Sequence, residues 1–290
     1  MPHVQELIDL LSLESIGVNR FRVHCQDLGF PNLFGGQVLG QRLSEAGQTL
    51  PAGEWAPHSL HAYFLRAGNV IDPIEFEVDC VRDGRSFATR QITASQKGKA
   101  ILIMMCSFQH PEDGFEHQDK MPDVKGPDGI LSQLELSRMF KDHFPDSVRD
   151  IYTADKPIEM RDVNPVNIFA PQKQDPIKHV WMKADAKLAN NPMQHACVLT
   201  YATDFNLIGT SMMPHGVTFY QRDMQVASLD HSVWFHRPIK MDEWLLYSID
   251  SPSASSSRGF CRGQVFNQQG EMVASVAQEG LIRKIDITEK

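Results

Sequence analysis

Three polar side chains stand inside otherwise apolar stretches of the second half of the chain. Asp204 lies between Tyr201 and Phe205, while Ser228 and Gln278 each lie in a run of mostly small or branched apolar residues. A buried carboxylate needs hydrogen-bonding or charged partners, and a buried glutamine needs partners for both ends of its amide. Held together, these groups can orient a water molecule and partly remove its proton. Taken singly, each residue fits a structural role better: a helix cap for Asp204 and core hydrogen bonds for the other two.

Other kinds of catalytic machinery have no signature in this sequence. There is no GxSxG, HExxH, GxGxxG or P-loop motif, so α/β-hydrolases, zinc peptidases and nucleotide-dependent enzymes have no support. The twelve histidines show no ligand spacing, and the five cysteines form no CxxC pair. We therefore expect neither a metal nor a cofactor.

These polar residues must be positioned by helices and strands. In the first half of the chain we predict two helices followed by an antiparallel meander of strands. Apolar residues recur at helical spacing in residues 4–13, which predicts a short helix with one buried face. Two glycines at 35–36 permit a tight turn into a second helix, predicted at 36–50. Strand patterns separated by turn signals then follow at 59–66, 74–82, 86–96 and 100–109.

The second half repeats this plan after a connecting segment. Residues 111–130 are rich in Pro, Asp and Gly, and a short helix is predicted at 131–144. Helical spacing indicates a helix at 192–207. Strands are predicted at 158–164, 178–184, 224–236, 243–251, 257–267 and 271–282.

Short motifs recur at a nearly constant distance. Residues 63–66 resemble residues 234–237, which lie 171 positions later, and the turn at 96–98 resembles 268–270, which lies 172 positions later. Such offsets indicate an internal duplication, with chance similarity between two antiparallel meanders as the alternative. We predict an N-terminal domain at 1–110, a linker segment at 111–155 and a C-terminal domain at 156–290. Each domain is an α+β unit with one central helix.

Segments along nearly the whole chain resemble the acyl-CoA thioesterase II family, in order and at the family's spacings. They are residues 34–38, 58–66, 82–87, 201–204, 229–238, 254–259 and 278–280. The resemblance implies a double hot-dog fold, in which each half wraps an antiparallel sheet around a long central helix. It also implies that Asp204, Ser228 and Gln278 are the catalytic set. Relatives often carry threonine at position 228, so serine keeps the hydroxyl and loses a methyl group.

The function that this resemblance implies is hydrolysis of fatty acyl-CoA to free fatty acid and CoA. A thiolate leaves readily, so direct attack by an activated water is sufficient, with no covalent intermediate. The oxyanion that develops needs preorganised donors, and the backbone N–H groups at Gly35 and Gly36 are our candidates. We place His58 near the substrate in a supporting role. Cations for the CoA phosphates are available at Arg66, Arg82, Arg85, Arg90, Arg237 and Arg258.

Two other functions stay open. A hot-dog hydratase uses an aspartate–histidine pair, and we expect no histidine beside Asp204. Asp230 and His231 are adjacent on one predicted strand, so their side chains point to opposite faces. A non-catalytic acyl-CoA-binding or sensor protein is compatible with the fold, although the presence of all three polar residue types favours an enzyme.

Composition and charge indicate which binding partners and which cellular compartment to expect. The net charge is −8 and no run of Lys or Arg is visible, so nucleic acid is not an expected partner. The longest apolar run, at 100–106, is too short to span a membrane. No signal peptide opens the chain, its end at 288–290 is not a peroxisomal signal, and the scattered cysteines suit a reducing compartment. We therefore expect a cytoplasmic protein, and the resemblance implies a homo-oligomer, either dimer or tetramer.

Overall fold

One antiparallel sheet runs through the molecule. The computed structural model describes residues 3–12, 14–29 and 32–286, and its strands follow the order β1-β2-β4-β5-β6-β3-β10-β13-β12-β11-β8-β7, with β9 also paired to β13. The strands are β1 (Glu14–Gly17), β2 (Arg20–Val23), β3 (Ala56–Phe64), β4 (Ile74–Asp83), β5 (Phe87–Gln96), β6 (Lys99–Gln109), β7 (Ile158–Asp162), β8 (Ile177–Ala184), β9 (Met224–Ser228), β10 (Asp230–Phe235), β11 (Leu245–Ser255), β12 (Arg258–Asn267) and β13 (Met272–Lys284).

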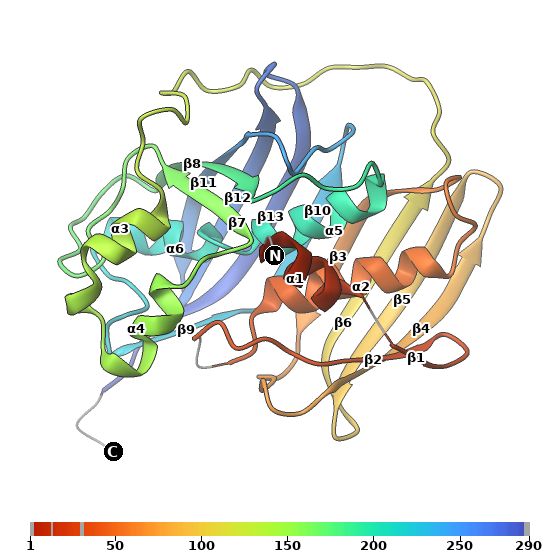
Figure 1. Cartoon of the computed structure of the whole chain (residues 1–290), viewed down its shortest axis with the longest axis horizontal. Coiled ribbons are helices and arrows are strands. Elements are labelled where there is room, and N and C mark those ends of the chain that lie inside the picture. The colour runs from red at the N-terminus through yellow and green to blue at the C-terminus, as the bar shows by residue number, and fades with distance from the viewer. Residues whose placement is uncertain (1–2, 13, 30–31, 287–290) are drawn as a thin grey trace.

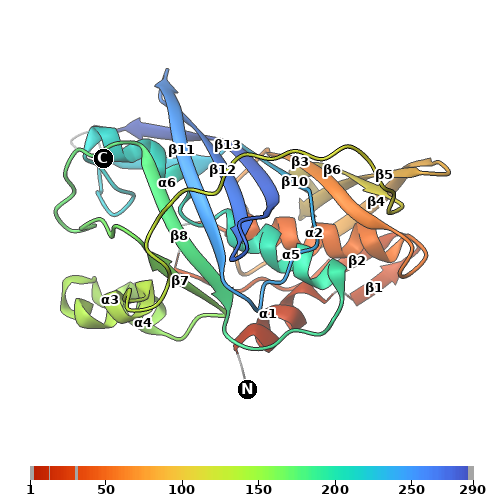
Figure 2. The ribbon, with the colours of Figure 1, turned by 90° about the horizontal axis from the view of Figure 1, so that it is seen from above.

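Two central helices pack side by side on the inner face of this sheet, α2 (Gly35–Gln48) and α5 (Pro192–Thr203) (Figures 1 and 2). They run antiparallel, because a Cβ on Gly36 would lie 2.5 Å from the Tyr201 carbonyl oxygen and one on Gly40 would lie 3.0 Å from that of Cys197. Glycine therefore allows a helix-to-helix approach that a larger residue would prevent. Each helix, wrapped by its own half of the sheet, matches the predicted double hot-dog arrangement.

The two halves join through the pairing of β3 with β10. His61 lies opposite Ser232 in this antiparallel pair, and these residues are 171 positions apart, the spacing of the sequence repeat. Equivalent strands of the two copies therefore meet around a local two-fold axis at this pair. The duplication is visible in the fold, while the domain boundaries at 110 and 155 stay a prediction.

Several predicted elements differ in the structure. The helix predicted at 192–207 ends at Thr203, because Asn206 adopts a left-handed conformation (φ 66°), and a separate helix α6 (Leu207–Met212) follows. The strand predicted at 224–236 is interrupted at Leu229 between β9 and β10. Strands β1 and β2 were not predicted. The predicted end of the first helix at Leu13 and the chain end at 288–290 lie outside the described residues.

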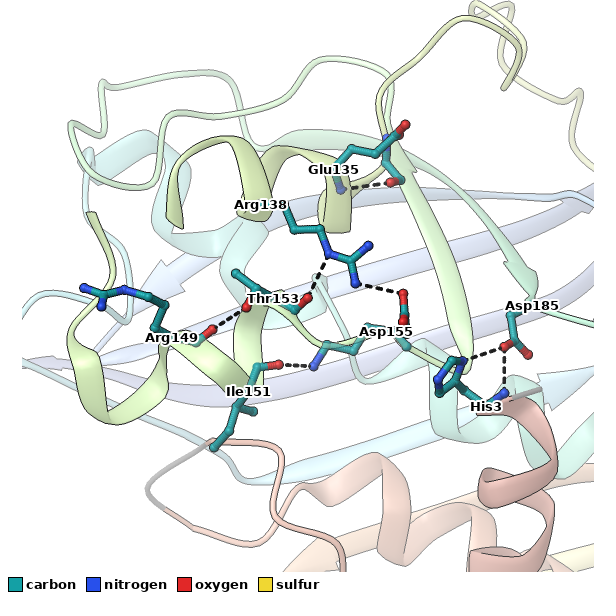
Figure 3. Close-up of polar contacts among 10 residues, drawn as sticks. His3, Glu135, Arg138, Arg149, Ile151, Thr153, Asp155 and Asp185 are labelled. Atoms are coloured by element: carbon teal, nitrogen blue, oxygen red, sulfur yellow. Dashed lines mark hydrogen bonds and ion pairs between the residues drawn. The ribbon is translucent and has the colours of Figure 1, made fainter. Parts of the chain in front are cut away.

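The first helix, α1 (His3–Leu11), is anchored to the C-terminal half. Its buried face, with Val4, Leu7 and Leu11, packs on α2 and α5. The backbone N–H of His3 donates to Asp185 at 2.8 Å, and Figure 3 shows this contact beside the linker helices. Among the described residues, no helix is both long enough and apolar enough to cross a bilayer.

The linker packs against the C-terminal half, with its upstream part on the outer face of the sheet and its two helices beside β7 and α6. Its helices are α3 (Gln133–Met139), which starts with a Ser132–Glu135 capping box, and α4 (Asp146–Thr153), and a short 3₁₀ turn lies between them. Arg138 joins the two helices by donating to the Thr153 carbonyl and to Asp155 (Figure 3). Further upstream, apolar linker residues pack over a small outer cluster made of Trp181, Leu246 and Phe266.

A fully buried ion pair lies on α2. Arg42 and Glu45 are both 0% exposed, 3.6 Å apart, and the Arg42 guanidinium stacks 3.4 Å from the centre of the Phe76 ring. No hydrogen bond within the described residues reaches the guanidinium nitrogens of Arg42 or the carboxylate oxygens of Glu45. Burial lowers the pKa of Arg42 to about 9 and raises the pKa of Glu45 to about 8, each opposed in part by the other charge. The pair is therefore poorly compensated for its loss of hydration.

We expect removal of one partner of this pair to destabilise the protein and removal of both to restore it. Glu45→Leu should lower the free energy of unfolding by about 3–5 kcal/mol, because it leaves a buried guanidinium without an opposite charge. The double variant Arg42→Met/Glu45→Leu should be at least as stable as the wild type. Urea unfolding of all three proteins measures this. A double variant less stable than the single one would contradict it.

Candidate active site

Asp204 stands where α5 ends and the chain turns toward α6. It caps the C-terminus of α5, and the left-handed Asn206 two residues later redirects the backbone. The Asp204 carboxylate is largely buried, and each of its oxygens accepts one hydrogen bond. Oδ2 accepts from the Gly36 N–H at 2.8 Å, and Oδ1 accepts from the Gln278 amide nitrogen at 3.1 Å. Donors from both halves of the chain thus compensate the buried charge.

Gln278 and Ser228 come from neighbouring strands. Ser228 ends β9 and lies opposite Gly280 of β13, two residues beyond Gln278. Gln278 is 0% exposed, and its amide nitrogen donates both to Asp204 and to the Ser228 hydroxyl oxygen, the latter at 2.6 Å. The structure therefore brings Asp204, Ser228 and Gln278 into one hydrogen-bonded group, although they are distant in the sequence.

Both glycines at the start of α2 belong to this group. Gly36 donates its N–H to Asp204, and a Cβ on Gly35 would lie 2.7 Å from the Phe64 ring and 2.9 Å from Asp204 Oδ2. The first N–H groups of a helix have no partner within the helix, so α2 presents donors at this point. The Gly36 donor is used by the Asp204 carboxylate, which leaves Gly35 as the candidate donor for an oxyanion.

A histidine that we did not expect accompanies this site. His231, on β10, is 0% exposed, and its Nδ1 lies 4.0 Å from Asp204 Oδ1 and 3.0 Å from Gln278 Oε1. The expectation that no histidine lies beside Asp204 is therefore wrong. Burial lowers the pKa of His231, and the Asp204 carboxylate only partly opposes this effect. Asp230 and His231 do face opposite ways, but the buried face of β10 is the one that meets the end of α5, which strand pattern alone cannot show.

His58 lies apart from the group. It is on β3, six residues before Phe64, which is about 20 Å at the usual rise of a strand. Its ring contacts Phe87 edge-on at 5.6 Å, and burial lowers its pKa. In the described part of the chain, no hydrogen bond or ion pair joins it to Asp204, Ser228 or Gln278.

Among its described residues, the N-terminal half has no second copy of this group. The residue that caps the C-terminus of α2 is Thr49, where Asp204 caps α5, so a hydroxyl replaces the carboxylate. Arg90, only 2% exposed, donates from Nε to that hydroxyl at 2.6 Å and also binds Asp83. Cys106 stands 172 positions before Gln278 in the equivalent strand. The part of the chain that the structure describes thus shows one such group, and Arg90, buried and already paired, is not available to a CoA phosphate.

Two other kinds of site, a metal centre and a cavity, were considered among the described residues. No group of three or more His, Cys, Asp or Glu side chains among them is arranged to hold a metal ion. A cavity of about 470 Å³ lies between α6, α3 and the loop at 164–172, with Asn206 at its edge. Neither Asp204 nor Gln278 lines this cavity, so it is separated from the hydrogen-bonded group by the turn into α6.

Two family models match the chain. The model for acyl-CoA thioesterase matches residues 147–281, and that for the acyl-CoA thioesterase N-terminal domain matches residues 26–109. The chain is 39% identical to acyl-CoA thioesterase 2 of Haemophilus influenzae over 97% of its own length and 98% of that protein. It is 34% identical to human acyl-coenzyme A thioesterase 8, over 94% of its own length and 88% of that protein.

Solved structures agree with the fold. The acyl-CoA thioesterase II TesB2 from Mycobacterium marinum superposes with a TM-score of 0.77 at 36% identity, covering 96% of this chain and 98% of that one. A hot-dog protein from Alicyclobacillus acidocaldarius superposes with a TM-score of 0.76 at 17% identity, covering 97% and 99%, and shows the fold alone. Fold and site together define a double hot-dog protein with a single carboxylate–amide–hydroxyl centre. The chain belongs to the acyl-CoA thioesterase family, and it is an enzyme of the thioester hydrolase class.

The contact between the helices provides a test of how the site is assembled. Gly36→Ala should push α2 away from α5, because the new methyl group would meet the Tyr201 carbonyl oxygen. We expect a loss of about 1–3 kcal/mol in the free energy of unfolding, together with a loss of thioesterase activity. Gly114→Ala is the control, since a Cβ there meets nothing within 4 Å. Equal stability of both variants would show that the close approach of α2 to α5 does not require glycine at position 36.

Proposed function

We propose that this enzyme hydrolyses fatty acyl-CoA to free fatty acid and CoA by direct attack of a water molecule. The observation that carries the proposal is the convergence of a carboxylate, an amide and a hydroxyl, through distances of 2.6 and 3.1 Å around the Gln278 amide nitrogen. The names of the relatives support the choice of acyl-CoA as substrate.

In the proposed mechanism, Asp204 acts as the general base. Its two oxygens accept from Gly36 and Gln278, which holds the carboxylate in one orientation and leaves further lone pairs for a water molecule. The Ser228 hydroxyl donates to the same water, while Gln278, whose two amide hydrogens are given to Asp204 and Ser228, holds these two groups in position around it. The water attacks the thioester carbonyl carbon while its proton passes to Asp204, and the C–S bond then breaks to release the CoA thiolate.

The oxyanion of the tetrahedral intermediate needs donors that are already in place. We assign this role to the N-terminus of α2, with the Gly35 N–H as the first candidate. The absence of a side chain at Gly35 keeps Phe64 and Asp204 close to that position. Helix N-termini favour negative charge, so this end of α2 supports both the carboxylate and the intermediate.

The two alternatives are less well supported by the geometry. A hydratase needs a histidine that reaches the substrate, whereas His231 is completely buried and its Nδ1 is engaged by Gln278. A non-catalytic acyl-CoA-binding protein would not need the carboxylate, amide and hydroxyl in mutual contact. All five cysteines are free, which supports our proposal that the enzyme works in the cytoplasm.

Asp204→Asn tests the base. We expect kcat to fall by about two to four decades, because the positioned base is lost. The assay is release of CoA from palmitoyl-CoA, detected with a thiol reagent, and thermal unfolding checks that the variant is folded. Inactive wild-type protein would favour the binding or sensor function, and a fully active variant would refute the assignment of Asp204.

Position 228 offers a matched pair of variants for the same assay. Ser228→Thr keeps the hydroxyl and should retain kcat, whereas Ser228→Ala removes the acceptor for the Gln278 amide and should lower kcat. Similar rates for the alanine and threonine variants would show that the hydroxyl does not hold the water.

We also propose that the enzyme self-associates through the outer face of its N-terminal half. Tyr63, Ile103, Met105 and Trp234 are between 37% and 65% exposed on neighbouring strands, and they flank the His61–Ser232 pair at the local two-fold axis. The matching outer face of the C-terminal half is covered by the linker, but the N-terminal one is not. An exposed apolar patch of this kind fits a second copy of the same chain.

Charge placed on this patch should separate the copies. Met105→Glu should lower the mass measured by light scattering during gel filtration to that of the monomer, because a buried carboxylate at the interface would have no partner. Phe115→Glu changes an exposed apolar residue on the linker and is the control. Wild-type protein that is already monomeric at micromolar concentration would refute this interface.

A further inference from the structure

His231 completes the hydrogen-bonded chain behind the proposed catalytic group. Its Nδ1 lies 3.0 Å from Gln278 Oε1, and its Nε2 lies 3.2 Å from the Thr203 hydroxyl oxygen. Both the ring and Gln278 are 0% exposed. Thr203 is the last residue of α5, directly before Asp204, and its carbonyl oxygen accepts from the Tyr247 hydroxyl at 3.0 Å. His231 therefore links β13 to the end of α5.

The direction of each hydrogen bond follows from the Asp204 carboxylate. An ionised carboxylate can only accept, so the Gln278 end that faces Asp204 must be the amide nitrogen. The other end, Oε1, is then an acceptor, and the nitrogen that faces it must carry a proton. A neutral His231 must therefore be protonated at Nδ1. Its Nε2 then accepts from the Thr203 hydroxyl, whose single hydrogen points to the ring rather than to the Thr200 carbonyl oxygen 3.1 Å away.

The Nδ1–H group matters because Gln278 Oε1 has no access to water. A buried amide oxygen without a donor is costly, and the side chain would turn to find one. Such a turn would remove the amide nitrogen from Asp204 and Ser228. With His231 in place, all polar atoms of the Gln278 amide keep partners in a single orientation.

We propose that His231 is a positioning residue for the hydrolytic reaction: its Nδ1–H holds Gln278 Oε1, so that the Gln278 amide nitrogen stays directed at Asp204 and Ser228. The inference rests on the proposed function of that group. His231 does not act on the substrate, because its ring is enclosed and both of its nitrogens are occupied. The charged groups that act on His231 are Asp204, at the end of α5, and its strand neighbour Asp230, whose side chain lies on the opposite face of β10.

Two substitutions of similar size separate this role from simple packing. Both His231→Asn and His231→Leu remove the ring and the contact with Thr203, but only asparagine retains a donor near the position of Nδ1. We expect His231→Leu to lower kcat by about 10- to 100-fold, the effect of losing one hydrogen bond to a charged group, with KM unchanged. His231→Asn should recover most of that kcat.

The pH profile gives a readout that packing would not change. Loss of the Gln278 donor disfavours the charged form of the Asp204 carboxylate, so the acidic limb of kcat/KM should move to higher pH in His231→Leu. In His231→Asn that limb should stay in place. Equal losses in both variants, without a shift of the limb, would overturn the proposal in favour of a packing role.

The outcomes also distinguish this inference from the proposed function. If Asp204→Asn is inactive while His231→Leu retains full kcat, the catalytic assignment stands and the role of His231 is refuted. If Asp204→Asn is fully active, the proposed mechanism itself fails.

A measurement on the wild-type protein does not depend on the folding of any variant. Nitrogen-15 NMR of labelled histidines distinguishes the two neutral tautomers. We expect His231, assigned by comparison with His231→Asn or by sequential assignment, to be the Nδ1–H tautomer at neutral pH. An Nε2–H tautomer would overturn the proposal, because Gln278 Oε1 would then have no donor.

Discussion

Burial of the Asp204 carboxylate governs how the two halves of this enzyme fit together. A carboxylate removed from water must be compensated by donors, and here they come from opposite halves of the chain. Gly36 supplies its backbone N–H from α2, and Gln278 supplies its amide from β13. The Gly36 donor reaches Asp204 only because α2 and α5 lie closer together than a side chain at that position would allow. The candidate site and the contact between the halves therefore depend on the same hydrogen bonds.

The duplicated plan has diverged at the points where function requires it. The C-terminus of α5 is capped by Asp204, whereas that of α2 is capped by Thr49, whose hydroxyl accepts from the buried Arg90. The outer faces differ too, since the linker covers an apolar cluster on the C-terminal side and leaves the N-terminal side open. In the described residues, the two copies of one fold thus differ both at the proposed catalytic group and in how their outer faces are covered.

Much of the fold follows from local patterns. The alternation of buried and partly exposed residues along β5 is the pattern that predicted it, and Lys97 and Gly98 adopt the positive φ angles that a tight hairpin turn requires. The pattern was misleading where a single residue changes the backbone direction. Asn206 ends a run of helical spacing that continues into α6, so one helix was predicted where there are two. Strands β1 and β2 span only four residues each, too few to show a period.

The internal repeat and the order of the main elements could be predicted from the linear chain, because periodicity and turn residues act over a few positions. The residues of the proposed catalytic group were expected from the family resemblance. The partners of those residues could not be predicted from the linear chain. Gly36 and Asp204 are 168 positions apart, and His231 reaches Gln278 across 47 positions. We expected no role for His231 beside Asp204, because Asp230 and His231 point to opposite faces of one strand. The face that carries His231 is nevertheless the one that meets the end of α5. Which face meets which element depends on how the sheet wraps around the helices, and no local pattern encodes that.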